Sequence, residues 1–194
     1  MTFCIFALMK TKDDISKIES LVLYILNQCG GLQEIFSIAM IMYHCQRKCL
    51  ALYGRYLVNE DFHANAYGLT IPYTFKAIIN KCSSGVIFSQ DFFVENKQGK
   101  TFVYSKGIPD MDELALAEID IINETLSELK WKSDYEFCCM LKQDPAWLDA
   151  AARFEEDPTD SRISPIKMAR AEGASDDAIN YLKSNLYFDS IWSS

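Results

Sequence analysis

The chain of 194 residues is long enough to bury one ample hydrophobic core. Hydrophobic residues make up 49% of it and charged residues 24%, which is the composition of an ordinary globular domain and excludes an intrinsically disordered chain. The formal net charge of −8 argues against a surface that follows nucleic-acid phosphates, because such surfaces concentrate lysine and arginine, so we expect no direct binding to nucleic acid.

Two helices are expected in the first quarter of the chain. Asp13 or Asp14 is suited to cap the first helix, and the pair Gly30–Gly31 ends it, as glycine does at a helix C-terminus. Its apolar residues recur at the spacing of one helical face: Ile15, Ile18, Val22, Ile25 and Cys29. The second helix is expected over residues 32–53 and is apolar on all sides, which is typical of a central, buried helix.

The next stretch, residues 53–75, has neither a helical nor a strand period. Gly54 ends the preceding helix, a short extended piece passes through Phe62, and Gly68 forms a turn in which we expect a positive φ. Pro72 then opens a new helix, because its missing N–H costs nothing in the first turn. A loop rich in aromatic and turn residues between two apolar helices is typical of an interaction surface.

The pattern changes to strand in residues 85–104. Two apolar segments, 86–88 and 92–94, face residues 101–104 across a loop whose Gly99 suits the left-handed position of a hairpin turn. We therefore expect a small antiparallel β-hairpin or sheet here.

Helical signals return after the hairpin and continue to the C-terminus. The helix starts are marked by capping boxes or by a cap followed by proline: Asp110 with Glu113, Ser133 with Glu136, Asp144–Pro145 and Ser164–Pro165. An acidic connector, residues 155–160, precedes a helical pair near residues 165–171 and 176–186.

These elements predict a single α+β domain that is mainly α-helical, with about seven helices and one small antiparallel hairpin or sheet. We expect residues 1–155 to form the helical domain with the inserted hairpin. Residues 156–194 are expected to form a C-terminal helical pair that packs on the same domain.

The seven cysteines lack the spacing of a disulfide framework or a zinc site. Several lie within apolar helical patterns, as buried free thiols do in a reducing cytosol. The apolar N-terminus lacks the basic region and cleavage site of a signal peptide, and no segment reaches the ~20 apolar residues that span a bilayer. We expect a cytoplasmic protein without membrane contact, metal or cofactor.

Few residues suggest catalysis. Cys45 and Cys49 lie one helical turn apart on an apolar face, with His44 pointing nearly opposite, so buried structural thiols explain them better than a reactive site does. His63 is explained as a polar residue on the outward face of a strand, and no nucleophile elbow, phosphate loop or His-Glu-x-x-His motif is present. We expect no enzyme. A pocket joining His63 to Cys49 or Cys82 would favour a thiol enzyme or hydrolase instead.

Several short blocks together carry a family resemblance: Tyr53-Gly54-Arg55, Phe62-His63-Ala64, Tyr67-Gly68, Pro72 and Asp144-Pro145-Ala146-Trp147. Their order resembles the Panacea-domain family, the SocA-like, phage-associated antitoxins of toxin–antitoxin pairs, over roughly residues 13–155. The departures from the family pattern are Leu69 in place of proline, Thr70 in place of valine, Phe75 in place of tyrosine and Lys142 in place of histidine.

The resemblance implies an antitoxin-like module that neutralises a protein toxin by direct association, encoded beside it on a prophage or mobile element. The alternative is a phage-related adaptor or scaffold that presents a client to another machine. The sequence leaves open whether the chain forms a homo-oligomer. The expected partner-binding residues are Tyr53, Arg55, Phe62, His63, Tyr67, Gly68, Pro72, Tyr73 and Trp147. Trp147 is equally well explained as a core residue at the start of its helix.

Overall fold

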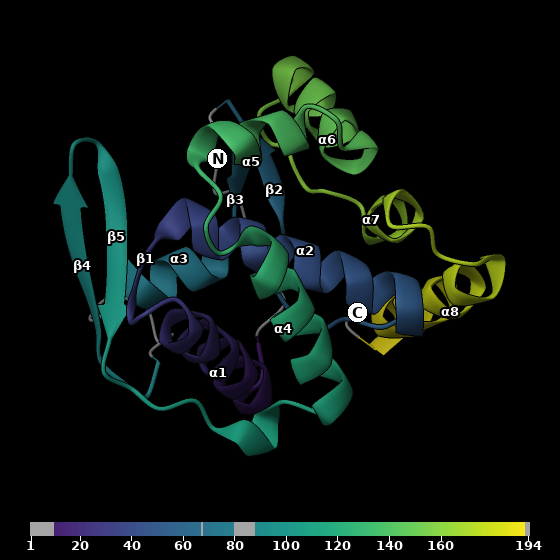
Figure 1. Ribbon diagram of the computed structural model, residues 1–194. Helices are drawn as coiled ribbons and strands as arrows, with labels where there is room; N and C mark the ends of the chain where they lie inside the picture. The colour runs from purple at the N-terminus through teal and green to yellow at the C-terminus, as the bar shows by residue number, and fades with distance from the viewer. Residues whose placement is uncertain (1–9, 67, 80–87, 193–194) are drawn as a thin grey trace, which may run out of the picture.

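The computed structural model describes residues 10–66, 68–79 and 88–192 (Figure 1). This part of the chain contains eight α-helices, one 3₁₀ helix and two small antiparallel sheets, which confirms the mainly helical α+β class. The helices are α1 (Lys12–Gln28), α2 (Ile35–Tyr53), α3 (Pro72–Ile79), η1 (Met111–Glu113), α4 (Leu116–Leu129), α5 (Asp134–Leu141), α6 (Pro145–Glu156), α7 (Pro165–Ala171) and α8 (Asp176–Trp192). The strands are β1 (Leu32–Glu34), β2 (His63–Asn65), β3 (Gly68–Thr70), β4 (Phe92–Lys97) and β5 (Lys100–Ser105).

Helix α2 runs through the middle of the molecule, as Figure 1 shows, and contacts α4, α5, α7 and α8. Ile38, Met42, Cys45 and Cys49 on one side of this helix are buried. Met40 and Ile41 on its other sides are buried as well, so the prediction of a central helix is confirmed. The expected start at residue 32 is wrong, because residues 32–34 form β1 and pair with β5 before the helix begins at Ile35.

Helix α1 begins two or three residues earlier than the acidic pair predicted. Thr11 is the N-cap: its hydroxyl accepts from the Asp14 backbone N–H at 3.1 Å, and the Asp14 carboxylate accepts from the Thr11 N–H at 2.8 Å. This reciprocal capping box satisfies two backbone donors. The predicted glycine stop is confirmed, since Gly30 and Gly31 both have positive φ directly after the helix.

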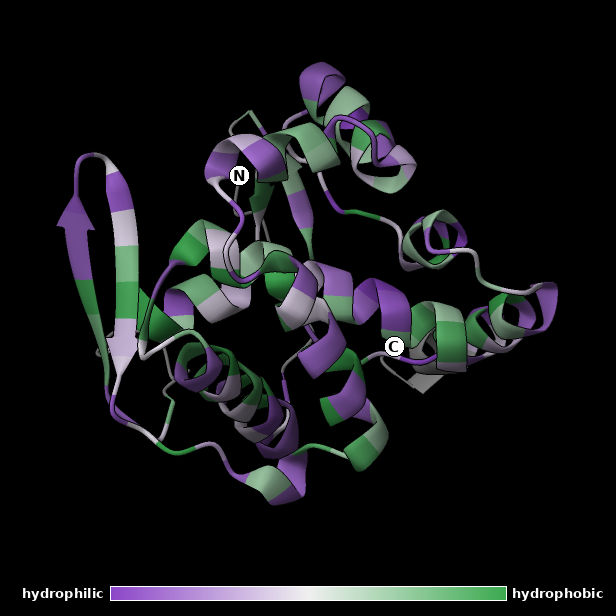
Figure 2. Ribbon diagram, in the orientation of Figure 1, coloured by the Kyte–Doolittle hydropathy of each residue, from purple (hydrophilic) through white to green (hydrophobic). Residues whose placement is uncertain are grey.

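The larger sheet has the strand order β1-β5-β4. Strands β4 and β5 join through Gln98 and Gly99, whose φ values of 51° and 78° define the two-residue turn that fits the twist of paired strands. Figure 2 shows a hydrophilic tip on this hairpin and hydrophobic residues nearer its base. Of the expected preceding strand, Val86 and Ile87 lie outside the described residues, while Phe88 packs on Phe92 with ring centroids 5.1 Å apart.

The smaller sheet is the β2–β3 hairpin, which lies within the aromatic loop that follows α2. The connector after α6 runs along β2: Ala64 N–H donates to the Ser161 carbonyl at 2.8 Å, and Ile163 N–H donates to the Phe62 carbonyl at 2.8 Å. The segment that follows the acidic connector thus holds the hairpin from one side.

The helix starts in the second half are mostly as expected. Ser133 caps α5, while Asp144 and Ser164 cap α6 and α7 with a proline in the first turn, so these three predictions are confirmed. The start expected at Asp110 is wrong for the long helix, because Asp110 caps only η1 and α4 begins at Leu116.

The C-terminal helices α7 and α8 both contact α2. Helix α6 extends to Glu156 and so ends beside the expected boundary at residue 155, and the division into two segments stays a prediction. Among the described residues, no helix has both the length and the apolar character needed to cross a membrane.

Candidate partner-binding groove

The aromatic loop is fixed at its beginning by the turn that ends α2. Gly54 has φ +62°, and a Cβ on it would lie 2.8 Å from the Ala178 carbonyl of α8. The Asn185 side-chain amide of the same helix donates to the Gly54 carbonyl at 3.3 Å. Helix α8 therefore packs directly on this turn, and only glycine permits so close an approach.

The middle of the loop is fixed by Glu60, a carboxylate that is only 3% exposed. It accepts from the Thr74 backbone N–H at 2.7 Å and from the Thr74 hydroxyl at 2.6 Å, so it caps the start of α3 from outside that helix. Burial raises the pKa of Glu60, against the hydrogen bonds from Thr74 that lower it. The carboxylate joins two parts of the loop that lie 14 residues apart.

The β2–β3 hairpin is fixed to α2 and α6 through Gly68. Its φ of +132° confirms the predicted positive φ, and a Cβ there would meet the Phe36 ring at 3.1 Å. The Trp147 indole N–H donates to the Gly68 carbonyl at 2.9 Å. One glycine therefore sets the distance of the hairpin from both neighbouring helices.

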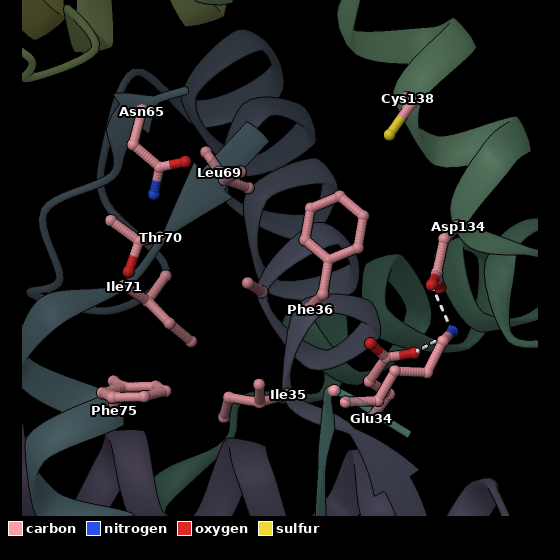
Figure 3. A pocket seen from close by; sticks show the side chains of 13 residues that line it. Glu34, Ile35, Phe36, Asn65, Leu69, Thr70, Ile71, Phe75, Asp134 and Cys138 are labelled. Atoms are coloured by element: carbon pink, nitrogen blue, oxygen red, sulfur yellow. Dashed lines mark hydrogen bonds and ion pairs between the residues drawn. The ribbon is translucent and has the colours of Figure 1, made fainter. Parts of the chain in front are cut away.

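Between this hairpin, α2, α5 and the β4–β5 turn lies a groove with a volume of about 530 Å³, hereafter the groove. Its apolar lining comes from the start of α2, from β3 and from α3: Ile35, Phe36, Ala39, Leu69, Ile71 and Phe75. Figure 3 shows the Phe36 ring between the β3 side chains and the α5 side. The aromatic loop therefore forms one whole wall, to which Asn65 and Thr70 also belong.

The opposite end of the groove is charged. The Lys100 ammonium, next to the hairpin turn, lies 2.8 Å from the Glu34 carboxylate and also contacts the Asp134 carboxylate at the start of α5 (Figure 3). Burial raises the pKa of Glu34, while the hydrogen bond from Lys100 lowers it. Three elements that are far apart in the sequence thus meet in one charged cluster at the groove.

A buried polar network supports α6 behind the hairpin. Asp144 accepts from the Tyr43 hydroxyl at 2.8 Å and from Arg47 Nη1 at 2.6 Å, and its other oxygen accepts from the Ala146 N–H at 2.9 Å. Arg47 also contacts Glu172 at 2.8 Å, after the end of α7. The burial of the Asp144 carboxylate is tolerated because it is paired with Arg47 and both of its oxygens accept hydrogen bonds. Asp144 thereby fixes the start of α6 and hence the position of Trp147.

None of the expected binding residues that the structure describes lines the groove, although four of them lie next to its walls. Gly68 touches Phe36 behind its wall, and Trp147 is half-buried beside Gly68, where it has a structural hydrogen bond. Pro72 and Tyr73 form the first turn of α3, the helix that also carries Phe75.

The other expected residues lie elsewhere. Tyr53 and Arg55 flank the C-terminal end of α2, which lies about 26 Å along the helix from Phe36. Phe62 is 2% exposed and its ring packs on Tyr43 of α2, so it anchors the loop in the core.

His63 is half-buried, and its Nδ1 lies 2.9 Å from the Ser161 hydroxyl, which ties β2 to the connector. Burial lowers the pKa of His63. Tyr67 lies outside the described residues. The partner-binding role of this set stays a prediction.

The half-buried His44 and the buried thiols of α2 have pKa values that disfavour their charged forms at neutral pH. Burial raises the pKa of Cys45 to about 12 and that of Cys49 to about 11, and it lowers the pKa of His44 to about 4. No group of metal-ligating side chains occurs among the described residues, and Cys82 lies outside them.

Sequence reasoning missed most of the residues that line the groove. Phe36 belongs to the helix that is apolar on all sides, and Leu69 and Phe75 stand out in the sequence only as departures from the family pattern. Lys100 follows the predicted hairpin turn, which is a signal that it lies at a projecting corner, but its partners Glu34 and Asp134 could not be found without the tertiary structure.

The fold and its groove define a mainly helical α+β protein with an apolar surface groove that is charged at one end. The model of the family described as antitoxin SocA-like, Panacea domain, matches residues 40–148, which is more than half of the chain. The chain belongs to this family of antitoxin-like proteins. No curated protein and no solved structure matches it.

Proposed function

We propose that this protein is a non-enzymatic antitoxin that neutralises a protein toxin by holding a segment of it in the groove. We further propose that the toxin is encoded by an adjacent gene on a prophage or mobile element and that both proteins act in the cytoplasm. Membership of the antitoxin-like family supports a protein partner.

The single observation that carries this proposal is the construction of the groove. The loop between α2 and α3 carries most of the blocks of the family resemblance, and it forms one wall of the groove. Glu60, Gly68 and Trp147 hold this wall by hydrogen bonds, so the groove is formed before a partner arrives. Preorganised surfaces lose less conformational entropy on binding.

The chemistry of the candidate nucleophiles supports a binding role over catalysis. The thiols of Cys45 and Cys49 are protonated at neutral pH because burial raises their pKa values, and a protonated thiol is a poor nucleophile. The contact between His63 and Ser161 joins two neighbouring extended segments, and neither residue lines the groove.

The test is co-expression of the adjacent gene with this protein, scored by growth. The variant Phe75→Ala removes an aromatic ring that lines the groove and is 38% exposed. Tyr104→Ala is the matched control, because this aromatic side chain is 37% exposed but lies on the larger sheet, away from the groove. We expect wild type and Tyr104→Ala to relieve growth arrest and Phe75→Ala to fail, with binding weakened by roughly 2 kcal/mol or more.

Three outcomes contradict the proposal. A neighbouring gene product that arrests growth and is not relieved by the wild type contradicts neutralisation. Equal relief by both variants contradicts the groove as the binding site. Binding of the neighbouring protein without relief of growth arrest favours the adaptor alternative.

A further inference from the structure

The charged end of the groove carries one more negative than positive group. The Glu34 and Asp134 carboxylates share a single ammonium, that of Lys100. The Glu34 carboxylate is only 12% exposed, so water stabilises its charge poorly. Asp134 lies in the first turn of α5, where the helix dipole favours a negative charge. Two carboxylates therefore share one ammonium at this end of the groove, and a second cation would complete the cluster.

This charge excess lies directly beside an apolar surface. Ile35 and Phe36 follow Glu34 in the chain, and their side chains line the same cavity as Leu69, Ile71 and Phe75. Figure 3 shows the Phe36 ring between the β3 wall and the Asp134 side of the groove. The volume of about 530 Å³ falls within the ~300–1,000 Å³ of ligand-sized clefts, so it suits a few side chains of an inserted segment.

From this geometry, we infer that the occupant is a partner segment in which an apolar anchor residue is flanked by arginine or lysine. The anchor packs on Phe36, Leu69 and Phe75, and the flanking cation pairs with Glu34 and Asp134. This inference rests on the proposed function and names the chemistry of the partner at that site. A second copy of this chain is disfavoured as occupant, because its net charge of −8 repels another copy and a basic segment meets the opposite charge.

The structure offers a matched pair of charge variants. Glu34→Gln with Asp134→Asn removes both carboxylates at the groove. Glu124→Gln with Glu128→Gln is the control, because these two carboxylates also share one lysine, Lys48, on the C-terminal half of α2. Each pair changes the net charge of the protein by the same amount, so long-range attraction is affected equally.

For a third variant, Lys100→Met, we expect the affinity for a basic segment to change in the opposite direction. Lys100→Met keeps most of the side-chain stem but leaves the two carboxylates without their ammonium. Binding of a basic segment should then become tighter, which a groove damaged by mutation would not show. Lys100→Met also tests the inference if the variant with Glu34→Gln and Asp134→Asn fails to fold.

The probe is a short fluorescent peptide with a leucine–phenylalanine core flanked by arginines, and its twin carries glutamines in place of the arginines. Binding is measured by fluorescence anisotropy at ~0.15 M salt, where distant surface charges are screened. We expect the arginine peptide to bind the wild type about tenfold or more tightly than its twin. The variant with Glu34→Gln and Asp134→Asn should bind the arginine peptide about tenfold more weakly than the wild type. The control variant with Glu124→Gln and Glu128→Gln should bind it less than about twofold more weakly, and Lys100→Met should bind it more tightly.

Several results would overturn the inference: no saturable binding of the arginine peptide, equal binding of the twins, equal weakening by both variant pairs, or weaker binding by Lys100→Met. Dimerisation of the protein that is lost in Phe75→Ala would identify a second copy as the occupant and would also overturn it. The growth assay is independent of these measurements. Relief of growth arrest without peptide binding refutes this inference alone, whereas peptide binding without relief refutes only the antitoxin role.

Discussion

The substitution Gly68→Ala tests the construction of the groove wall most directly. Gly68 has φ +132°, which side chains with a Cβ rarely adopt, and its added Cβ would lie 3.1 Å and 3.3 Å from two atoms of the Phe36 ring. Backbone strain of this kind costs roughly 1–3 kcal/mol, and overpacking against a ring that cannot move freely adds ~1 kcal/mol or more. We therefore expect Gly68→Ala to lower the free energy of unfolding by about 2–4 kcal/mol.

The measurement is urea denaturation followed by far-UV circular dichroism, with Gly99→Ala as the control. Gly99 also has a positive φ, +78°, but its Cβ would meet nothing within 4 Å. Backbone strain alone should therefore destabilise the control, and its free energy of unfolding should fall by about 1 kcal/mol. If Gly68→Ala is no more destabilising than Gly99→Ala, the close contact with Phe36 does not support the wall, and the account of the groove is wrong.

Three further predictions concern the surroundings of the groove and the core of α2. Trp147→Phe should cost about 1–2 kcal/mol in urea denaturation, because the Gly68 carbonyl loses its 2.9 Å donor while the ring is largely kept. His44 stays neutral in the folded protein down to about pH 4, whereas in the unfolded chain it binds a proton near pH 6.5. The free energy of unfolding should therefore fall by up to about 3 kcal/mol as the pH falls through this window. His44→Gln should remove this pH dependence. Cys45 and Cys49 should react slowly with a thiol reagent in the native protein and quickly in urea; rapid native reaction would contradict their burial.

Local chemistry explains which parts of the fold could be predicted from the sequence. The caps at Ser133, Asp144 and Ser164 and the turn at Gly99 depend on a few neighbouring residues, so their patterns were sufficient. Strand β1 was missed, because a three-residue strand acquires its identity only by pairing with β5, about 70 residues further on. The general position of the aromatic loop, residues 53–75, was predictable in the same local way.

The groove itself could not be predicted, because its walls depend on long-range contacts. Glu34, Lys100 and Asp134 meet only after β1 has paired with β5 and α5 has packed on α2. Each residue read singly is an ordinary charged side chain near the end of an element. A sequence pattern contains no information on which of many such charges share one cluster.

The blocks that carry the family resemblance mostly have scaffold roles, while the groove is lined by other residues. Asp144 caps α6 and positions Trp147, and the Trp147 indole then holds the carbonyl of Gly68, so two blocks almost 80 residues apart meet in one hydrogen bond. The side chains that face the groove, Phe36 and Phe75 among them, lie outside these blocks or depart from them. A frame fixed by glycine, cap and indole tolerates changes in the side chains that it presents, because those side chains contribute little to its own hydrogen bonds. The family blocks therefore belong to the frame of the groove, and if the groove holds the partner, as proposed, the choice of partner depends on residues outside these blocks.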